Sequence, residues 1–218
     1  MKFIITIRHG EAYKNLKDIS GGLGSGLTPR GVEQVQESAQ RVAAIIAKNP
    51  QLKTTIYRSC DRVQLMETTE ILTDRLGIPC QIDERFAPIK LGVFNGMSGK
   101  KQRELYPVAA QEMQEWNDGV RDIMDVHVEG MQNPGEHVNK IIDFLNDQED
   151  NSVTIMVGTR SDLSAVKNIT RGNHPWKKDT YRFIPTDFAE VDMFAYDEMG
   201  FKSVMNFNPQ RENESDTI

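Results

Sequence analysis

The residues that decide the fold are Phe3-Ile4-Ile5-Thr6-Ile7, which are followed directly by Arg8-His9-Gly10-Glu11. The first five are apolar or β-branched, and they form a continuous run instead of an alternating one. This pattern predicts an interior strand of a parallel sheet that is covered on both faces. Ligands of open α/β sheets bind beyond the carboxyl ends of the strands, so we expect functional residues directly after this run.

Strands and helices alternate along the rest of the chain. Apolar residues at helical spacing predict helices at 29–49, 65–76, 106–116, 136–147 and 163–169. Further strands are predicted at 54–57, 79–82 and 153–158, with two outer strands at 189–196 and 201–207. This order predicts an α/β fold: a three-layer α/β/α sandwich around a mostly parallel central sheet.

The length of 218 residues fits one large domain, which we assign to residues 1–210. The segment 87–131 is irregular and holds an acidic cluster, so we expect it to be a capping insertion at one end of the sheet. Residues 211–218 are expected to be a frayed tail.

Charge and cysteine content exclude several classes of protein. The chain has 26 Lys and Arg against 32 Asp and Glu, a net charge of −6, so we expect neither a nucleic-acid nor a membrane partner. Cys60 and Cys80 are the only cysteines, which excludes a disulfide framework and favours a cytoplasmic protein. We also expect no metal and no other cofactor. His127 and His137 are interpreted as surface or capping residues.

Arginines follow three of the predicted strands. Arg8 follows the first strand, Arg58 and Arg62 follow the second, and Arg160 follows the strand at 153–158. Two further polar residues, His9 and Thr159, stand beside these arginines. Guanidinium groups bind phosphate oxygens in a forked geometry, so these strand ends together predict a phosphate pocket. A neutral imidazole in such a pocket is a candidate nucleophile for phosphoryl transfer.

A family resemblance joins these residues. Arg8-His9-Gly10-Glu11 is followed by Asn15, and later by Leu27-Thr28-Pro29-Arg30-Gly31 with Gln34 and by Pro134-Gly135-Glu136. The chain thereby resembles the histidine phosphatase superfamily, whose fold is phosphoglycerate mutase-like. The match extends in patches from residue 3 to about residue 170.

The resemblance implies roles for single residues. His9 would be phosphorylated during turnover, while Arg8 and Asn15 would bind the phosphate. The second arginine of the family falls best on Arg62, with Arg58 as the second choice. Arg160 can add positive charge if its side chain turns inward.

Two positions depart from the family pattern. Thr159 stands where the family has its second histidine, and Pro88 aligns with the glutamate that donates a proton. Glu11, Glu84 and Asp162 are nearby acids that could replace that donor, and Glu11 is also a candidate substrate-binding residue. The sequence is compatible both with Thr159 as the natural residue and with Thr159 as an engineered replacement of histidine.

We therefore expect a phosphatase that hydrolyses a small phosphomonoester through a phosphohistidine at His9, with weakened activity. The alternative is a catalytically impaired pseudophosphatase that binds a phosphorylated ligand or partner. A phosphomutase is a third reading, weaker because returning the phosphoryl group requires well-placed acid–base groups. The expected partner is a phosphorylated small molecule or inorganic phosphate; a monomer and a homodimer both stay open.

Overall fold

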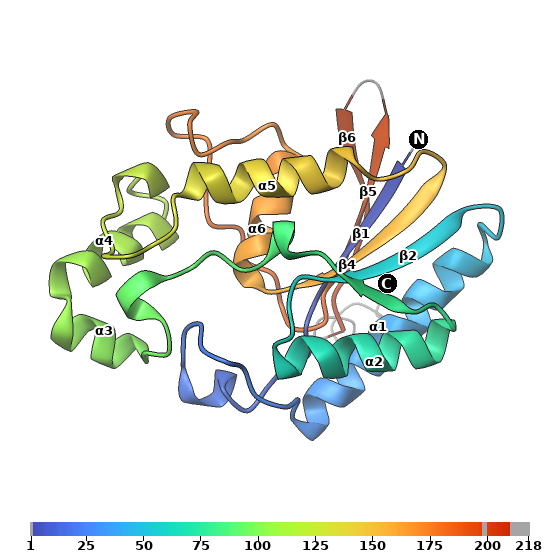
Figure 1. Ribbon diagram of the computed structural model, residues 1–218, viewed down its shortest axis with the longest axis horizontal. Coiled ribbons are helices and arrows are strands. Elements are labelled where there is room, and N and C mark those ends of the chain that lie inside the picture. The colour runs from blue at the N-terminus through green and yellow to red at the C-terminus, as the bar shows by residue number, and fades with distance from the viewer. Residues whose placement is uncertain (1, 198–199, 210–218) are drawn as a thin grey trace, which may run out of the picture.

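The computed structural model describes residues 2–197 and 200–209 of the chain (Figure 1). The predicted frayed tail, 211–218, lies outside the described residues. Six strands form one sheet in the order β3-β2-β4-β1-β5-β6. Their bounds are β1 Lys2–Arg8, β2 Lys53–Arg58, β3 Cys80–Ile82, β4 Ser152–Gly158, β5 Val191–Asp197 and β6 Gly200–Phe207.

The central part of the sheet is parallel. β1 pairs in parallel with β4, β4 with β2, and β2 with β3, whereas β5 and β6 are antiparallel to their neighbours. Arg8 at the end of β1 lies opposite Gly158 in β4, and Arg58 at the end of β2 lies opposite Val157. The carboxyl ends of these three strands therefore meet at one edge of the sheet.

Helices cover both faces of the sheet, as Figure 1 shows. The helices α1 (Pro29–Ala47) and α2 (Val63–Leu76) pack on one face, and α5 (Pro134–Asn146) and α6 (Arg160–Ile169) on the other. Side chains of β1 alternate between the two cores: Ile4 lies in the core with α5 and α6, and Ile5 in the core with α1 and α2. Both faces of the strand are thus apolar because both are buried. The predicted three-layer α/β/α sandwich is confirmed.

Helix caps fix where the helices begin. Pro29 is the first residue of α1, and the Thr28 hydroxyl accepts a hydrogen bond from the Gly31 N–H at 3.0 Å. In α5, the Asn133 side chain accepts hydrogen bonds from the N–H groups of Gly135 and Glu136. α2 follows Arg62 and α6 follows Thr159, so both helices begin at the edge where the strands end.

The segment 87–131, hereafter the cap, extends beyond one end of the sheet (Figure 1). We predicted one helix at 106–116, but the structure has two, α3 (Gly99–Leu105) and α4 (Pro107–Asn117). Pro107 has no N–H to continue α3, and Tyr106 before it leaves the helical conformation, with φ −136° and ψ 60°. The residues of α3 are mostly polar and charged, so no apolar spacing indicated a helix there.

Short 3₁₀ turns complete the described chain. They are η1 (Asn15–Lys17), η2 (Glu84–Phe86), η3 (Gly92–Phe94) and η4 (Ile123–Asp125). Within residues 2–197 and 200–209, no helix has both the length and the apolar character needed to cross a membrane.

Candidate active site

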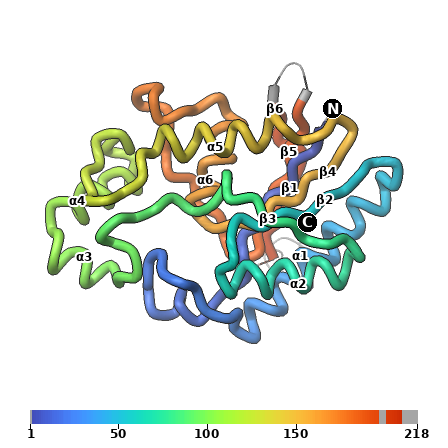
Figure 2. The backbone as a smooth tube through the Cα atoms, viewed as in Figure 1, coloured from blue at the N-terminus to red at the C-terminus, as the bar shows by residue number. Residues whose placement is uncertain are grey.

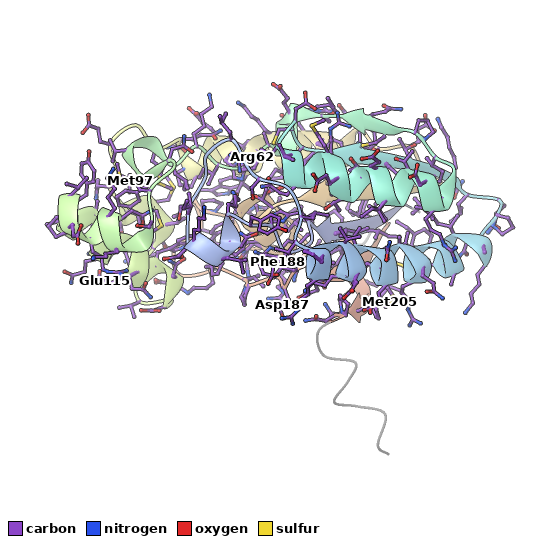
Figure 3. All side chains as sticks on the ribbon, turned by 90° about the horizontal axis from the view of Figure 1, so that it is seen from below. Arg62, Met97, Glu115, Asp187, Phe188 and Met205 are labelled. Atoms are coloured by element: carbon purple, nitrogen blue, oxygen red, sulfur yellow. The ribbon has the colours of Figure 1, made fainter. Side chains whose placement is uncertain are left out.

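A cavity of about 350 Å³ lies between the sheet edge and the cap. Five of the residues predicted at strand ends line it, namely Arg8, His9, Arg62, Thr159 and Arg160. Figure 3 shows Arg62 and Phe188 between the helices α1 and α2 on one side and the cap on the other. The strand ends therefore meet in one place, as the sequence predicted.

His9 is held by its backbone and by its ring. Its N–H donates to the Gly158 carbonyl at 3.2 Å, which continues the pairing of β1 and β4. The ring nitrogen Nδ1 lies 2.7 Å from the Gly10 carbonyl oxygen. A carbonyl oxygen only accepts, so Nδ1 carries the proton and Nε2 keeps its lone pair. Gly10 is required there because an added Cβ would lie 2.4 Å from the Gly31 carbonyl oxygen.

The imidazole of His9 is neutral at physiological pH. Burial lowers its pKa to about 3, and the positive charges of Arg8, Lys14 and Arg62 act in the same direction. A neutral ring with a free Nε2 lone pair is the form that can attack phosphorus.

Arg8 is fixed by its neighbours. Its Nη1 donates to the Thr186 carbonyl oxygen at 2.6 Å, and its guanidinium lies 3.9 Å from the centroid of the Phe188 ring. Burial and the nearby Arg160 lower its pKa to about 10, so it stays protonated at neutral pH. The buried Arg8 Nε has no hydrogen-bond partner among the described residues, which is uncommon for a buried donor.

Lys14 is a further cation that the sequence analysis missed. It lies in the loop 11–27, which Figure 2 shows beside the cap and which the bridge between Ile19 and Ser98 joins to it. Its Nζ donates to the Gly21 carbonyl at 2.9 Å. Burial, then Arg62 and Arg8, lower the pKa of Lys14 to about 8. Its place next to Asn15 was the available signal, but a lysine in a polar loop usually faces solvent.

Thr159 faces its own helix. Its N–H donates to both oxygens of Asp162, at 3.0 and 2.8 Å, and its hydroxyl also donates to that carboxylate. Burial raises the pKa of Asp162 to about 6, although the hydrogen bonds from Thr159 act against the rise. Thr159 lines the cavity, whereas Asp162 is not part of the lining. The neighbouring Arg160 places its guanidinium 5.3 Å from the Phe183 ring centroid.

Two predicted binding residues lie elsewhere, and this corrects the expectation that they line the pocket. Arg58 bonds Asp61 at 2.7 Å, and neither residue lines the cavity. Glu11 accepts a hydrogen bond from the Thr28 hydroxyl at 2.8 Å, because it follows β1 toward the start of α1.

The other predicted residues divide in the same way. Asn15 lines the cavity, and its Oδ1 accepts from the Ala12 N–H at 3.0 Å. Pro88 also lines it, whereas the exposed Glu84 does not. Asp18, which the sequence analysis did not single out, is the one carboxylate among the described lining residues. It is exposed and takes a left-handed φ of 50°.

The part of the cavity near the cap is mostly apolar and aromatic, and it includes an unexpected histidine. His137 is only 3% exposed and lines the cavity, so its interpretation as a surface or capping residue is wrong. It is on the same face of α5 as Ile141 and Phe144, which are buried in the core. His127, in contrast, has a side chain that is 78% exposed and bonds Glu112, as expected of a surface residue.

The described part of the chain contains no group of three or more His, Cys, Asp or Glu side chains placed to hold a metal ion. The site instead consists of a neutral, buried imidazole and four cations around it, Arg8, Lys14, Arg62 and Arg160. Cations in this arrangement stabilise the negative charge of a phosphoryl group.

Fold and site together define an α/β protein with a cation-lined cavity at the carboxyl end of a parallel sheet. The chain belongs to the histidine phosphatase superfamily (branch 1), whose sequence profile matches residues 4–205. No curated protein matches the chain in sequence.

Solved structures share the fold at low sequence identity. Bacillus stearothermophilus YhfR is 19% identical with a TM-score of 0.77, and the match covers 94% of this chain and 96% of that one. A phosphoserine phosphatase from Entamoeba histolytica, in complex with 3-phosphoglyceric acid, is 17% identical with a TM-score of 0.71, covering 96% and 98%. A mycobacterial glucosyl-3-phosphoglycerate phosphatase is 14% identical with a TM-score of 0.71, covering 95% and 99%.

Proposed function

We propose that the protein is a phosphomonoesterase that transfers the phosphoryl group of a small phosphorylated molecule to Nε2 of His9. One observation carries this proposal: a buried imidazole, neutral at physiological pH and oriented by Gly10, lies among four cations that line the same cavity. The phosphatases among the structural neighbours support the same class of reaction.

Binding comes first in this proposal. A phosphate monoester carries close to two negative charges at neutral pH, which Arg8, Arg62, Lys14 and Arg160 offset. Arg8 lines the cavity beside His9, so its guanidinium is placed to donate to one equatorial oxygen. The Nδ1 bond to Gly10 keeps Nε2 available for attack.

The transfer then proceeds in two steps. The Nε2 lone pair forms a bond to phosphorus while the ester P–O bond breaks, and the alkoxide leaves with the electron pair and takes up a proton. A water molecule next attacks phosphorus, the P–N bond breaks, and its electron pair returns to Nε2. The products are the alcohol and inorganic phosphate.

The leaving group receives little acid assistance in this site. Pro88 has no proton to give, and the Thr159 hydroxyl donates to Asp162 instead of into the cavity. General acid catalysis typically contributes about 10²–10⁴ in rate. We therefore propose an enzyme with weakened activity that depends strongly on the leaving group, and water supplies the proton.

A second candidate is a pseudophosphatase that binds a phosphorylated ligand without turnover. The same orientation of Thr159 favours it, because the cations needed for binding line the cavity whether or not a proton donor does. In both cases the partner is a phosphorylated small molecule or inorganic phosphate.

The test is hydrolysis of p-nitrophenyl phosphate, whose leaving group requires no acid, together with calorimetric binding of inorganic phosphate. The variants are His9→Ala and, as a matched control, His127→Ala, which removes an exposed histidine of the cap. Turnover by the wild type and His127→Ala that is lost in His9→Ala supports the enzyme. Phosphate binding without turnover supports the pseudophosphatase. Equal rates with and without His9 contradict the proposed mechanism.

A further inference from the structure

Besides Arg8, two residues that line the cavity each carry a buried polar atom without a hydrogen-bond partner among the described residues. These atoms are Nε2 of His137 and Nε1 of Trp116. His137 is on the first turn of α5, and Trp116 is near the end of α4. Both residues line the cavity that holds His9.

Such atoms require an explanation. Buried polar groups in native proteins are nearly always paired, because removal from water without a new hydrogen bond is costly. Trp116 Nε1 only donates, so it needs an acceptor. Burial, with Lys140, lowers the pKa of His137 to about 4, so its ring is neutral and each nitrogen can donate or accept according to its tautomer.

The cations of the cavity come from the strand ends and from the loop 11–27, not from the cap. Lys14, Arg62 and Arg8 each lower the pKa of His9, and Arg160 lowers that of Arg8, so the four cations form one cluster around the nucleophile. Apart from these four residues, Asp18 is the only Lys, Arg, Asp or Glu in the described lining. The cap itself contributes no Lys or Arg to the described lining, so it offers no cation to a second anionic group on the ligand.

An aromatic wall connects the two ends of the cavity. Arg160 lies over the Phe183 ring, and Phe183 packs edge-on against Trp116 with ring centroids 5.6 Å apart. Ile123 and Met131 of the cap line the same space. Flat rings pack well against such a surface.

We propose that His137 and Trp116 form a second recognition point, which binds hydrogen-bonding groups on the alcohol part of the substrate. The substrate class is then the phosphomonoesters of uncharged alcohols that carry a heteroaromatic ring, and not the phosphorylated small acids. A nucleoside monophosphate is an accessible example. This inference rests on the proposed function, because the cation cluster must hold the phosphate for the ring to reach the cap.

The test measures binding by calorimetry in a His9→Asn background, which prevents turnover. The four probes are inorganic phosphate, phenyl phosphate, adenosine 5′-monophosphate and 3-phosphoglycerate. The variants added to this background are His137→Phe and Trp116→Phe, which keep a ring and remove the polar atom. His127→Phe, on the exposed surface of the cap, is the matched control, and thermal melting verifies that each variant folds.

We expect the nucleotide to bind about tenfold more tightly than phenyl phosphate, and 3-phosphoglycerate to bind no better than phenyl phosphate. His137→Phe and Trp116→Phe should each lose most of the nucleotide's advantage, while inorganic phosphate binds all variants alike. Equal affinity for phenyl phosphate and the nucleotide, or unchanged nucleotide binding in both variants, overturns the inference and leaves the proposed function intact. Absence of phosphate binding in the parent overturns both.

Discussion

The guanidinium of Arg8 stacks on the ring of Phe188, with 3.9 Å between the guanidinium carbon and the ring centroid. Glu190 holds the loop that carries Phe188 in place. Its carboxylate accepts a hydrogen bond from the Asp187 N–H and forms an ion pair with the buried Lys167 at 2.8 Å. A buried ion pair far along the chain thereby fixes the orientation of an arginine beside the nucleophile.

Phe188→Leu should weaken substrate binding more than it slows chemistry. Loss of the cation–π contact is worth about 1 kcal/mol, so KM for p-nitrophenyl phosphate should rise about fivefold, with kcat nearly unchanged. The control is Phe207→Leu, because Phe207 stacks on Arg41 at 5.7 Å and does not line the cavity. A KM that rises equally in both variants would show that the effect comes from general loosening.

Lys14→Met should weaken inhibition by inorganic phosphate about tenfold at pH 7, because a charged hydrogen-bond donor is lost. The pKa of Lys14 is lowered to about 8, so wild type and variant should converge as the pH rises above 8 and the lysine becomes neutral. Lys17→Met makes the same charge change in the same loop, outside the cavity lining, and should leave the inhibition constant unchanged. Identical effects of the two substitutions would mean that Lys14 acts only through the net charge of the loop and does not contact the phosphate.

Thr159→His should accelerate the hydrolysis of p-nitrophenyl phosphate by a factor on the order of 100, the value of one well-placed donor to a phosphoryl oxygen. Thr159 lines the cavity, so we expect the larger imidazole at this position to extend into it. Thr159→Val is the control: its rate should stay within about twofold of wild type, since the hydroxyl donates to Asp162, and it should lose about 1 kcal/mol of stability. A rate for Thr159→His at or below that of wild type contradicts this account of the site.

Asp162 should make the protein less stable as the pH rises. Its pKa is raised to about 6 in the folded chain against 3.8 for the free group, so between these values the folded state binds the proton that the unfolded state has released. The stabilisation is present below pH 3.8 and is lost as the pH rises through 6. His9, with its lowered pKa, acts in the opposite sense.

The comparison with Asp162→Asn isolates this contribution, because the amide oxygen can still accept from the Thr159 N–H. The difference in the free energy of unfolding, variant minus wild type, should increase by about 2 kcal/mol between pH 4 and pH 7, because only the wild type loses the stabilisation. Urea unfolding at several pH values measures it. A difference that does not vary with pH would mean that the pKa of Asp162 is not raised.

The sequence predicted the architecture because the signals were local. The continuous apolar runs at Phe3–Ile7 and Val153–Val157 indicated strands buried on both faces, and both are central strands of the sheet. The cap was harder to predict, since α3 has no apolar face and Pro107 divides the helical segment into two. Pro107 marks this break in the sequence, but no apolar spacing before it indicated a helix that it could divide.

The site was predictable in part for the same reason. Arg8 ends β1, His9 follows it, and Arg62 lies in the turn between β2 and α2, so the sheet topology brings them together. Lys14 and His137 depend on how a loop and a helix pack against the cavity, which spacing does not reveal. Arg58 also follows a strand, but its pairing with Asp61 keeps it from the pocket.

The most direct test of the account is to trap the phosphorylated protein. Wild type mixed with p-nitrophenyl phosphate and quenched within one turnover should carry a single phosphoryl group, stable in base and labile in acid, on the peptide that contains His9. His9→Ala should carry none. Turnover by the wild type without a phosphorylated intermediate, or an equal label on both proteins, would contradict the central claim that Nε2 of His9 accepts the phosphoryl group.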